Sequence, residues 1–305
     1  MGAKTVATAV VAAMMLAYTF SAAAAEPTVL GMRPTYTQAL PIEPPNAQAI
    51  QSRIWVPGLD EGYVPQGLIV LDTVAFVGAY RSTDRKQDRG PCRVYEVDLA
   101  TGAVNGHFDV SDLCGHAGGL AYDGNSTLYI VDTRVVLAVE LPRSLKDRDT
   151  KRAIRQVLKL GGEVRGSLST WHDGALWIGS WNPKDPGVIF RFPQAALQAL
   201  GPEATLTEQQ ATRRLALPSL AQGAAFDGKG KLWVSLSNTK RGQFAVLDEA
   251  TGAVVATYET SPGVEGLAFA SPTRLWTVTE AGSQRWFEGL PFHPLVFALN
   301  PELLK

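Results

Sequence analysis

The chain has 305 residues, with 28 Lys and Arg against 29 Asp and Glu, and a formal net charge of −1. This balance gives no reason to expect nucleic acid or an anionic membrane surface as a partner. After the first 25 residues no stretch approaches the roughly 18 apolar residues that a bilayer crossing needs, so we expect a soluble protein without membrane association. We also expect a monomer.

The N-terminus is predicted to be a secretory signal peptide, residues 1–25. Lys4 precedes an apolar stretch from Val6 to Phe20, and Ala23-Ala24-Ala25 fits a small-residue cleavage site. We therefore expect a periplasmic or secreted protein after cleavage near Ala25. The Pro-rich residues 26–50 are predicted to form an extended arm on a single domain that spans residues 51–305.

The chain contains two cysteines, Cys92 and Cys114, and an even pair in an exported protein suggests a disulfide. The intervening "RVYEVDLATGAVNGHFDV" is predicted to be a hairpin that turns at residues 100–102, which brings Cys114 within reach of Cys92. A disulfide across such a loop stabilises by roughly 3 kcal/mol. A redox pair or a metal site is the weaker alternative, because the spacing is wide and only His116 lies nearby.

Five similar segments follow along the chain, and each is predicted to be strand, tight turn and strand. Each has a Gly near its start and an aromatic residue nine to eleven positions later. The glycines are Gly67, Gly119, Gly166, Gly223 and Gly266. The aromatic residues, which we expect to pack between repeats, are Phe76, Tyr129, Trp177, Trp233 and Trp276.

Each repeat continues with further strands, and three repeats are predicted to end their third strand at a short helix: "AVELPRSL", "FRFPQAAL" and "FALNPELL". A period of about 40 to 55 residues with four strands indicates a β-propeller. The last repeat lacks a fourth strand, and "QSRIWVPG" (residues 51–58) is available to supply it. We therefore predict an all-β propeller of five four-stranded blades, closed by an N-terminal strand that leaves no bare sheet edge.

The repeats also predict where polar side chains gather. In a propeller the innermost strand begins, and the second strand ends, at the same face of the disc. The residues just before each repeat Gly should therefore surround one channel mouth, with His116 nearby: Gln66, Gly118, Arg165, Gln222 and Glu265. The residues after the second strands should form its rim, among them Tyr80, Asp132, Trp181, Asn182, Asn238 and Glu280.

Two interpretations of this mouth remain open. Buried polar groups need partners, so Arg165 and Glu265 are either a structural ion pair or part of a ligand site shared with Gln66, Gln222 and His116. Aromatic residues outside the repeat register, Trp181 among them, are candidates to stack on a ligand. The upper loops carry an excess of basic residues, which favours a small anionic or carbonyl-bearing ligand or a protein loop.

"VEGLAFASPTRLWTVTEAGS" and "AQGAAFDGKGKLWVSLSN" resemble repeats of the broad superfamily of SMP-30/gluconolactonase, NHL-repeat and strictosidine-synthase-like propellers. The resemblance covers most of residues 63–300. It implies a divalent metal, Ca²⁺ or Zn²⁺, held at the axis by a Glu, an Asn and an Asp. The matching residues here are Glu265, Asn182 or Asn238, and Asp132. Arg165 departs from that pattern because a cation repels a metal, and those lactonases commonly have six blades.

No nucleophile elbow, H-E-x-x-H motif or phosphate-binding loop occurs in the sequence. Two functions from different classes therefore remain. The first is a periplasmic binding module whose ligand lies at the channel mouth. The second is a hydrolase or lyase acting on a small ester or lactone, with Glu265 as base or metal ligand and His116 as acid or base.

Overall fold

The computed structural model describes residues 1–2, 28–238, 240–288 and 291–305. Nearly all of the predicted signal peptide, including its cleavage site, lies outside these residues. Across the described residues, none of the helices has the length and apolar character that a membrane span requires.

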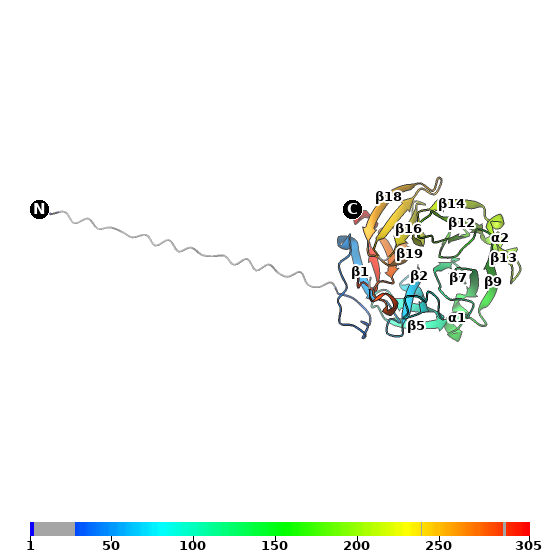
Figure 1. Ribbon diagram of the computed structural model, residues 1–305, viewed down its shortest axis with the longest axis horizontal. Helices are drawn as coiled ribbons and strands as arrows, with labels where there is room; N and C mark the ends of the chain where they lie inside the picture. Colours follow the sequence, from blue (N-terminus) through cyan, green and yellow to red (C-terminus); the bar gives the residue numbers. More distant parts are fainter. Residues whose placement is uncertain (3–27, 239, 289–290) are drawn as a thin grey trace.

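The strands form five sheets arranged as a ring, which Figure 1 views down the shortest axis of the molecule. Four sheets have four antiparallel strands, and one has a fifth, short strand at its edge. The innermost strands of successive blades contact one another in chain order, and the last contacts the first. The predicted five-bladed β-propeller is confirmed.

The blades have the following strands, from the innermost outwards. The first blade contains β2 (Tyr63–Leu71), β3 (Val74–Arg81), β4 (Cys92–Asp98) and β5 (Val104–Asp109). The second contains β6 (Gly119–Tyr122), β7 (Thr127–Asp132), β8 (Val135–Glu140), β9 (Ile154–Leu160) and β13 (Thr205–Leu206). The third contains β10 (Leu168–His172), β11 (Ala175–Gly179), β12 (Gly187–Pro193) and β14 (Arg213–Leu217). The fourth contains β15 (Ala221–Phe226), β16 (Leu232–Ser237), β17 (Gly242–Leu247) and β18 (Val254–Thr260). The fifth contains β19 (Val264–Ser271), β20 (Arg274–Thr279), β21 (Leu295–Leu299) and β1 (Ile50–Trp55).

An N-terminal strand closes the ring, as predicted. β1 pairs antiparallel with β21, from Ile50 opposite Leu299 to Trp55 opposite Leu295. In Figure 1 the blue β1 accordingly lies beside the red C-terminal end of the chain. Ile54 of β1 is fully buried, so the closing strand contributes apolar surface as well as hydrogen bonds.

The repeated residues explain why the blades fit together. The repeat glycines lie where neighbouring inner strands approach closely: a Cβ on Gly266 would stand 2.4 Å from the amide nitrogen of Leu68. The repeat aromatics are buried at the interfaces between blades, as expected from their register. Trp177 of the third blade packs against the fourth, and Trp276 of the fifth blade packs against the first.

Short helices follow the third strand in three blades, as the sequence indicates: α1 (Leu141–Asp147), α2 (Gln194–Gln198) and η4 (Pro301–Leu303). The loop after α2 contributes β13, which pairs with β9 of the second blade, and η2 (Glu208–Gln210). The other 3-10 helices are η1 (Ala47–Ala49), just before β1, and η3 (Gln284–Trp286), in the long connection between β20 and β21.

Candidate acid-base site at the upper mouth

We call the face at which the inner strands begin the upper face. In three blades the inner strand carries a β-bulge at the residue before the repeat Gly, with register shifts at 65–68, 221–223 and 264–267. A bulge turns a side chain out of the regular alternation. The bulges therefore direct Gln66, Gln222 and Glu265 towards the upper end of the channel.

Glu265 is a buried carboxyl group, with 1 % of its surface exposed. Its Oε1 accepts a hydrogen bond of 3.0 Å from Nε2 of Gln222. Burial raises its pKa well above the ordinary value, the negative charge of Glu280 raises it further, and Arg285 opposes both effects. Burial and the neighbouring carboxyl group therefore favour the protonated form of Glu265.

Glu280 lies directly after β20 and is the second carboxyl group of the site. Its Oε2 accepts hydrogen bonds from Nε1 of Trp286, at 2.6 Å, and from Nε2 of Gln66, at 3.3 Å. Burial raises its pKa to about 7, although Arg285 and the two hydrogen bonds act in the opposite direction. The two carboxyl groups interact, so they share protons as a pair.

Arg285 supplies the positive charge beside this pair. The side chain is buried, with 7 % exposed, and it donates hydrogen bonds to the hydroxyl of Tyr80 and to the carbonyl oxygen of Arg85. Its guanidinium also lies 4.6 Å from the ring centroid of Trp286. The hydroxyl of Tyr80 is held protonated, because burial raises its pKa.

His116 lies next to this group and stacks on Tyr80 with 4.5 Å between the ring centroids. Its Nδ1 is 2.6 Å from the carbonyl oxygen of Asp88, an acceptor, so Nδ1 carries the hydrogen. Burial lowers the pKa of the imidazole. His116 is thus a neutral ring whose Nε2 has a lone pair available.

Residues 281–288, which include η3, pack against the residues of the upper mouth, since Trp286 contacts Glu280 and Arg285 contacts Tyr80. Gln284 donates to the carbonyl oxygens of Leu59 and Asp60, in the connection between β1 and β2, at 2.8 and 3.1 Å. The N-terminal arm holds the same segment, since the hydroxyl of Tyr36 donates to the carbonyl oxygen of Gly282. We name residues 281–288 the closing segment.

Arg165 does not contribute the cation, and the structural ion pair with Glu265, one of the two interpretations of the mouth, does not form. Its Nη1 donates to the carbonyl oxygens of Gly162 and Val164, at 2.9 and 2.6 Å, and the described residues contain no Arg165–Glu265 salt bridge. The reason is local: β10 begins at Leu168, so Arg165 precedes the strand instead of occupying a bulge within it.

Three further predicted ligand residues lie in loops, and two of them, Asn182 and Asn238, have structural roles there. Oδ1 of Asn182 accepts from the backbone N–H groups of Lys184 and Asp185, and Oδ1 of Asn238 accepts from those of Lys240 and Arg241. Both side chains shape their own turns. Trp181 is exposed, at 42 %.

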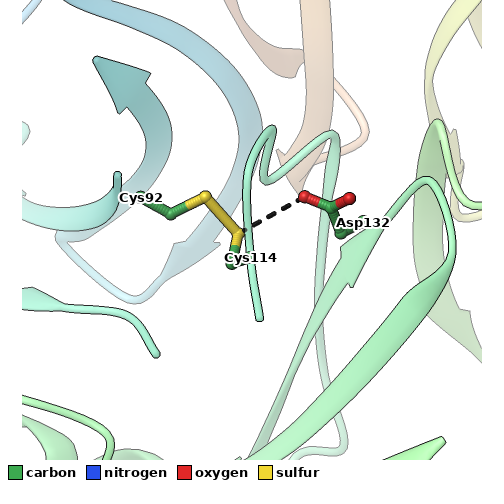
Figure 2. A group of neighbouring side chains, drawn as sticks. All are labelled: Cys92, Cys114 and Asp132. Carbon is green, nitrogen blue, oxygen red and sulfur yellow. Dashed lines mark hydrogen bonds between the residues drawn. A yellow bond between two sulfur atoms is a disulfide. The ribbon is translucent and has the colours of Figure 1, made fainter. Parts of the chain in front are cut away.

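Asp132 also has a structural role, next to the predicted disulfide between Cys92 and Cys114, which is present. The backbone N–H groups of Gly115 and His116 donate to its Oδ2 at 2.8 and 2.6 Å. Figure 2 shows its carboxylate directed at the disulfide. These hydrogen bonds, with help from Arg89, lower the pKa of Asp132 against the effect of burial.

The residues that a metal centre would need do not converge on one ion. Asp132 already binds backbone N–H groups, and the amide oxygens of Asn182 and Asn238 each accept two backbone hydrogen bonds. Cys92 and Cys114 come close to Asp132, but disulfide sulfurs are not thiolates and bind metal poorly. Glu265 lies near the positive charge of Arg285, and its surroundings favour the protonated form, which is a poor metal ligand. This donor set does not fit Ca²⁺ or Zn²⁺.

Sequence reasoning placed Arg285 only among the charges of the upper loops. The sequence feature that could have identified Arg285 as a site residue is its position five residues after Glu280, in a connection long enough to fold back towards the mouth. Which loop cation enters the channel depends on contacts with Tyr80 and Arg85, which are 205 and 200 residues away.

Comparison with known protein families and with curated proteins finds no match to the sequence. Among solved structures, a glutaminyl cyclase from Myxococcus xanthus superposes with a TM-score of 0.52 at 12 % identity, covering 78 % of this chain and 90 % of that one. The calcium-binding protein regucalcin from Agrobacterium tumefaciens has a TM-score of 0.47 at 16 % identity, covering 82 % and 93 %. A PQQ-bound aldose sugar dehydrogenase from Streptomyces coelicolor has a TM-score of 0.42 at 14 % identity, covering 78 % and 82 %. The chain is thus a β-propeller. Its likeness to these solved structures concerns the fold alone.

Proposed function

We propose that the upper mouth is an acid-base catalytic site for a small, neutral, carbonyl-bearing compound such as an ester, lactone or amide. The observation that carries this proposal is the pair of carboxyl groups, Glu265 and Glu280, whose pKa values are both raised around one buried cation. Strongly perturbed pKa values are common where proteins perform proton transfer.

The pair can divide the roles of acid and base. The surroundings of Glu265 raise its pKa and favour its protonated form, whereas Glu280, with a pKa of about 7, is ionised in a large share of molecules near neutral pH. For an ester, Glu280 would take a proton from water as the water oxygen bonds to the carbonyl carbon. Glu265 would give its proton to the leaving alkoxide as the carbon–oxygen bond breaks. The proton then returns from Glu280 to Glu265, so the cycle closes.

Two neighbours support this division. Arg285 provides a fixed positive charge next to the site, where negative charge develops on the carbonyl oxygen. His116 offers a neutral imidazole, a second group able to accept a proton. An anionic ligand is less suited, because Glu280 already brings negative charge to the buried site beside Arg285.

The second candidate is a binding module that performs no reaction. The observation favouring it is that both carboxyl groups are already hydrogen-bonded, by Gln222 and by Trp286 and Gln66, beneath the closing segment. For either function we propose a periplasmic or secreted location, which the disulfide supports because disulfides persist in oxidising compartments.

The test is turnover of an aryl acetate, a γ-lactone and a glutaminyl dipeptide, the last chosen because one neighbour is a glutaminyl cyclase. Loss of general acid or base catalysis typically lowers the rate by about 10²- to 10⁴-fold. We expect kcat to fall by about that factor in Glu265→Gln and Glu280→Gln, and to stay unchanged in the control Glu203→Gln, whose side chain is exposed. Ligand-induced stabilisation without any turnover would favour the binding module, and equal turnover in all variants would refute the acid-base proposal.

A further inference from the structure

The backbone beside His116 has an uncommon conformation. Ala117, the next residue, has a φ of +54°, in the left-handed region that an L-residue with a Cβ rarely adopts, and its side chain is fully buried. Its carbonyl oxygen accepts a hydrogen bond of 3.2 Å from the N–H of Gly67 in β2, the inner strand of the first blade. Backbone strain of this kind persists only where surrounding contacts hold it, and it is frequent at functional sites.

Asp132, the last residue of β7, supplies contacts that hold this backbone. Its side chain is 1 % exposed, and its Oδ2 accepts from the backbone N–H groups of residues 115, 116 and 117 at 2.8, 2.6 and 3.3 Å. Its Oδ1 lies 3.2 Å from Nη1 of Arg89. Although burial opposes them, these contacts lower the pKa of Asp132 and keep the carboxylate charged. One charged oxygen thus fixes three consecutive amides, and the middle one belongs to His116.

The connection between β3 and β4 holds the ring of His116. The carbonyl oxygen of Asp88 binds Nδ1 of the imidazole at 2.6 Å. The backbone N–H of Gly90 donates to the carbonyl oxygen of Gly115 at 2.8 Å, and the disulfide then joins the same two segments. A ring hydrogen bond, a backbone hydrogen bond and a covalent bond therefore follow one another along this junction. Figure 2 shows the disulfide with the carboxylate of Asp132 beside it.

We propose that Asp132 is a positioning residue for His116 in the acid-base site, and that the disulfide belongs to the same device. Asp132 sets the backbone of His116, and the disulfide-linked segment sets its ring. Together they hold the imidazole against Tyr80, whose hydroxyl binds Arg285, the cation of the site. This inference rests on the proposed function for its effect on turnover, whereas the placement of His116 is measurable without turnover.

The tautomer of His116 distinguishes positioning from a purely structural role. A neutral imidazole in water carries its hydrogen mainly on Nε2, but the carbonyl oxygen of Asp88 requires a hydrogen on Nδ1. When Asp132 no longer fixes the backbone, the ring should lose this carbonyl partner, and the Nε2–H tautomer should become populated. A carboxylate that only stabilises the fold would change the melting temperature and leave the tautomer as it is.

The test is a two-bond proton–nitrogen NMR spectrum of the histidine rings at pH 8, assigned with His116→Gln. The test variant is Asp132→Asn. The matched control is Asp123→Asn, because Oδ1 of Asp123 likewise accepts from three backbone N–H groups, those of residues 125, 126 and 127, at 2.9, 3.0 and 2.9 Å. Asp123 lies in the turn between β6 and β7, at the opposite end of these strands from His116. A variant with both cysteines replaced by Ser tests the other half of the device.

We expect the Nδ1–H tautomer of His116 in wild type and in Asp123→Asn, and its partial or complete loss in Asp132→Asn and in the cysteine variant. An unchanged tautomer in folded Asp132→Asn, or the same change in Asp123→Asn, would overturn the proposal. Should Asp132→Asn not fold, an unchanged tautomer in the cysteine variant would overturn it.

Turnover is measured on the same variants. The kcat should fall in Asp132→Asn and stay unchanged in Asp123→Asn, and equal kcat values in the two variants would contradict a positioning role. Absence of turnover in the wild type would count against the acid-base function, and the tautomer would still decide whether Asp132 positions His116.

Discussion

Replacing Glu280 with Gln is predicted to change how stability depends on pH. Folding raises the pKa of Glu280 from 4.5 to about 7, so the folded state binds more protons than the unfolded chain between these values. Stability must then fall as pH rises through this window. At about 1.4 kcal/mol per pKa unit, Glu280 accounts for a loss of about 3 kcal/mol between pH 4.5 and pH 7.

The total slope of the wild type does not isolate this effect. Folding lowers the pKa of His293 to about 4 by burial, so His293 makes stability rise with pH over part of the same range. The informative quantity is therefore the difference in unfolding free energy between Glu280→Gln and wild type, in which His293 cancels.

Urea unfolding at pH 5 and pH 8 measures this difference. The amide introduced by Glu280→Gln retains an oxygen that can accept from Trp286 and Gln66 but carries no charge. We expect the variant to gain about 3 kcal/mol relative to wild type between the two pH values. A difference that is the same at pH 5 and pH 8 would show that Glu280 has an ordinary pKa and would refute the reasoning.

Three further predictions concern the framework of the ring. Replacing Cys92 and Cys114 with Ser should cost roughly 3 kcal/mol in unfolding free energy, measured by chemical denaturation, and no change would show that the disulfide contributes nothing. Ile54→Ala should lower the free energy of unfolding by about 2 to 5 kcal/mol, because the side chain is fully buried in the closing strand. The control Gln51→Ala, at an exposed position of the same strand, should lower it little, and equal effects would contradict closure by this strand. Asp132→Asn should lower the free energy of unfolding by about 2 kcal/mol at neutral pH, because it weakens the hydrogen bonds from backbone N–H groups. The loss should shrink as acid protonates the wild-type carboxylate, and a loss independent of pH would show that the charge of Asp132 does not matter.

The architecture was predictable because each blade repeats the same physical requirement. Gly266 permits close approach of inner strands, and Trp276 fills the space between blades, so both recur in register. The closing strand was predictable for a related reason: the last repeat lacked a fourth strand, and only the segment before the first repeat could supply it.

The site was predictable only where the repeat itself determines geometry. Gln66, Gln222 and Glu265 each lie at a β-bulge of their own inner strand, and the bulge directs the side chain towards the channel. Arg165 has the same position in its repeat but precedes its strand. The role of Arg285 depends on how one long loop packs on distant residues, which no local pattern encodes.

The central claim, that the upper mouth retains an exchangeable proton at neutral pH, is tested most directly by carbon NMR titration of the glutamate carboxyl groups, assigned with Glu265→Gln and Glu280→Gln. The account predicts that Glu280 titrates near pH 7 and that the pKa of Glu265 lies well above its ordinary range. Titration of both groups near the ordinary value of 4.5 would contradict it.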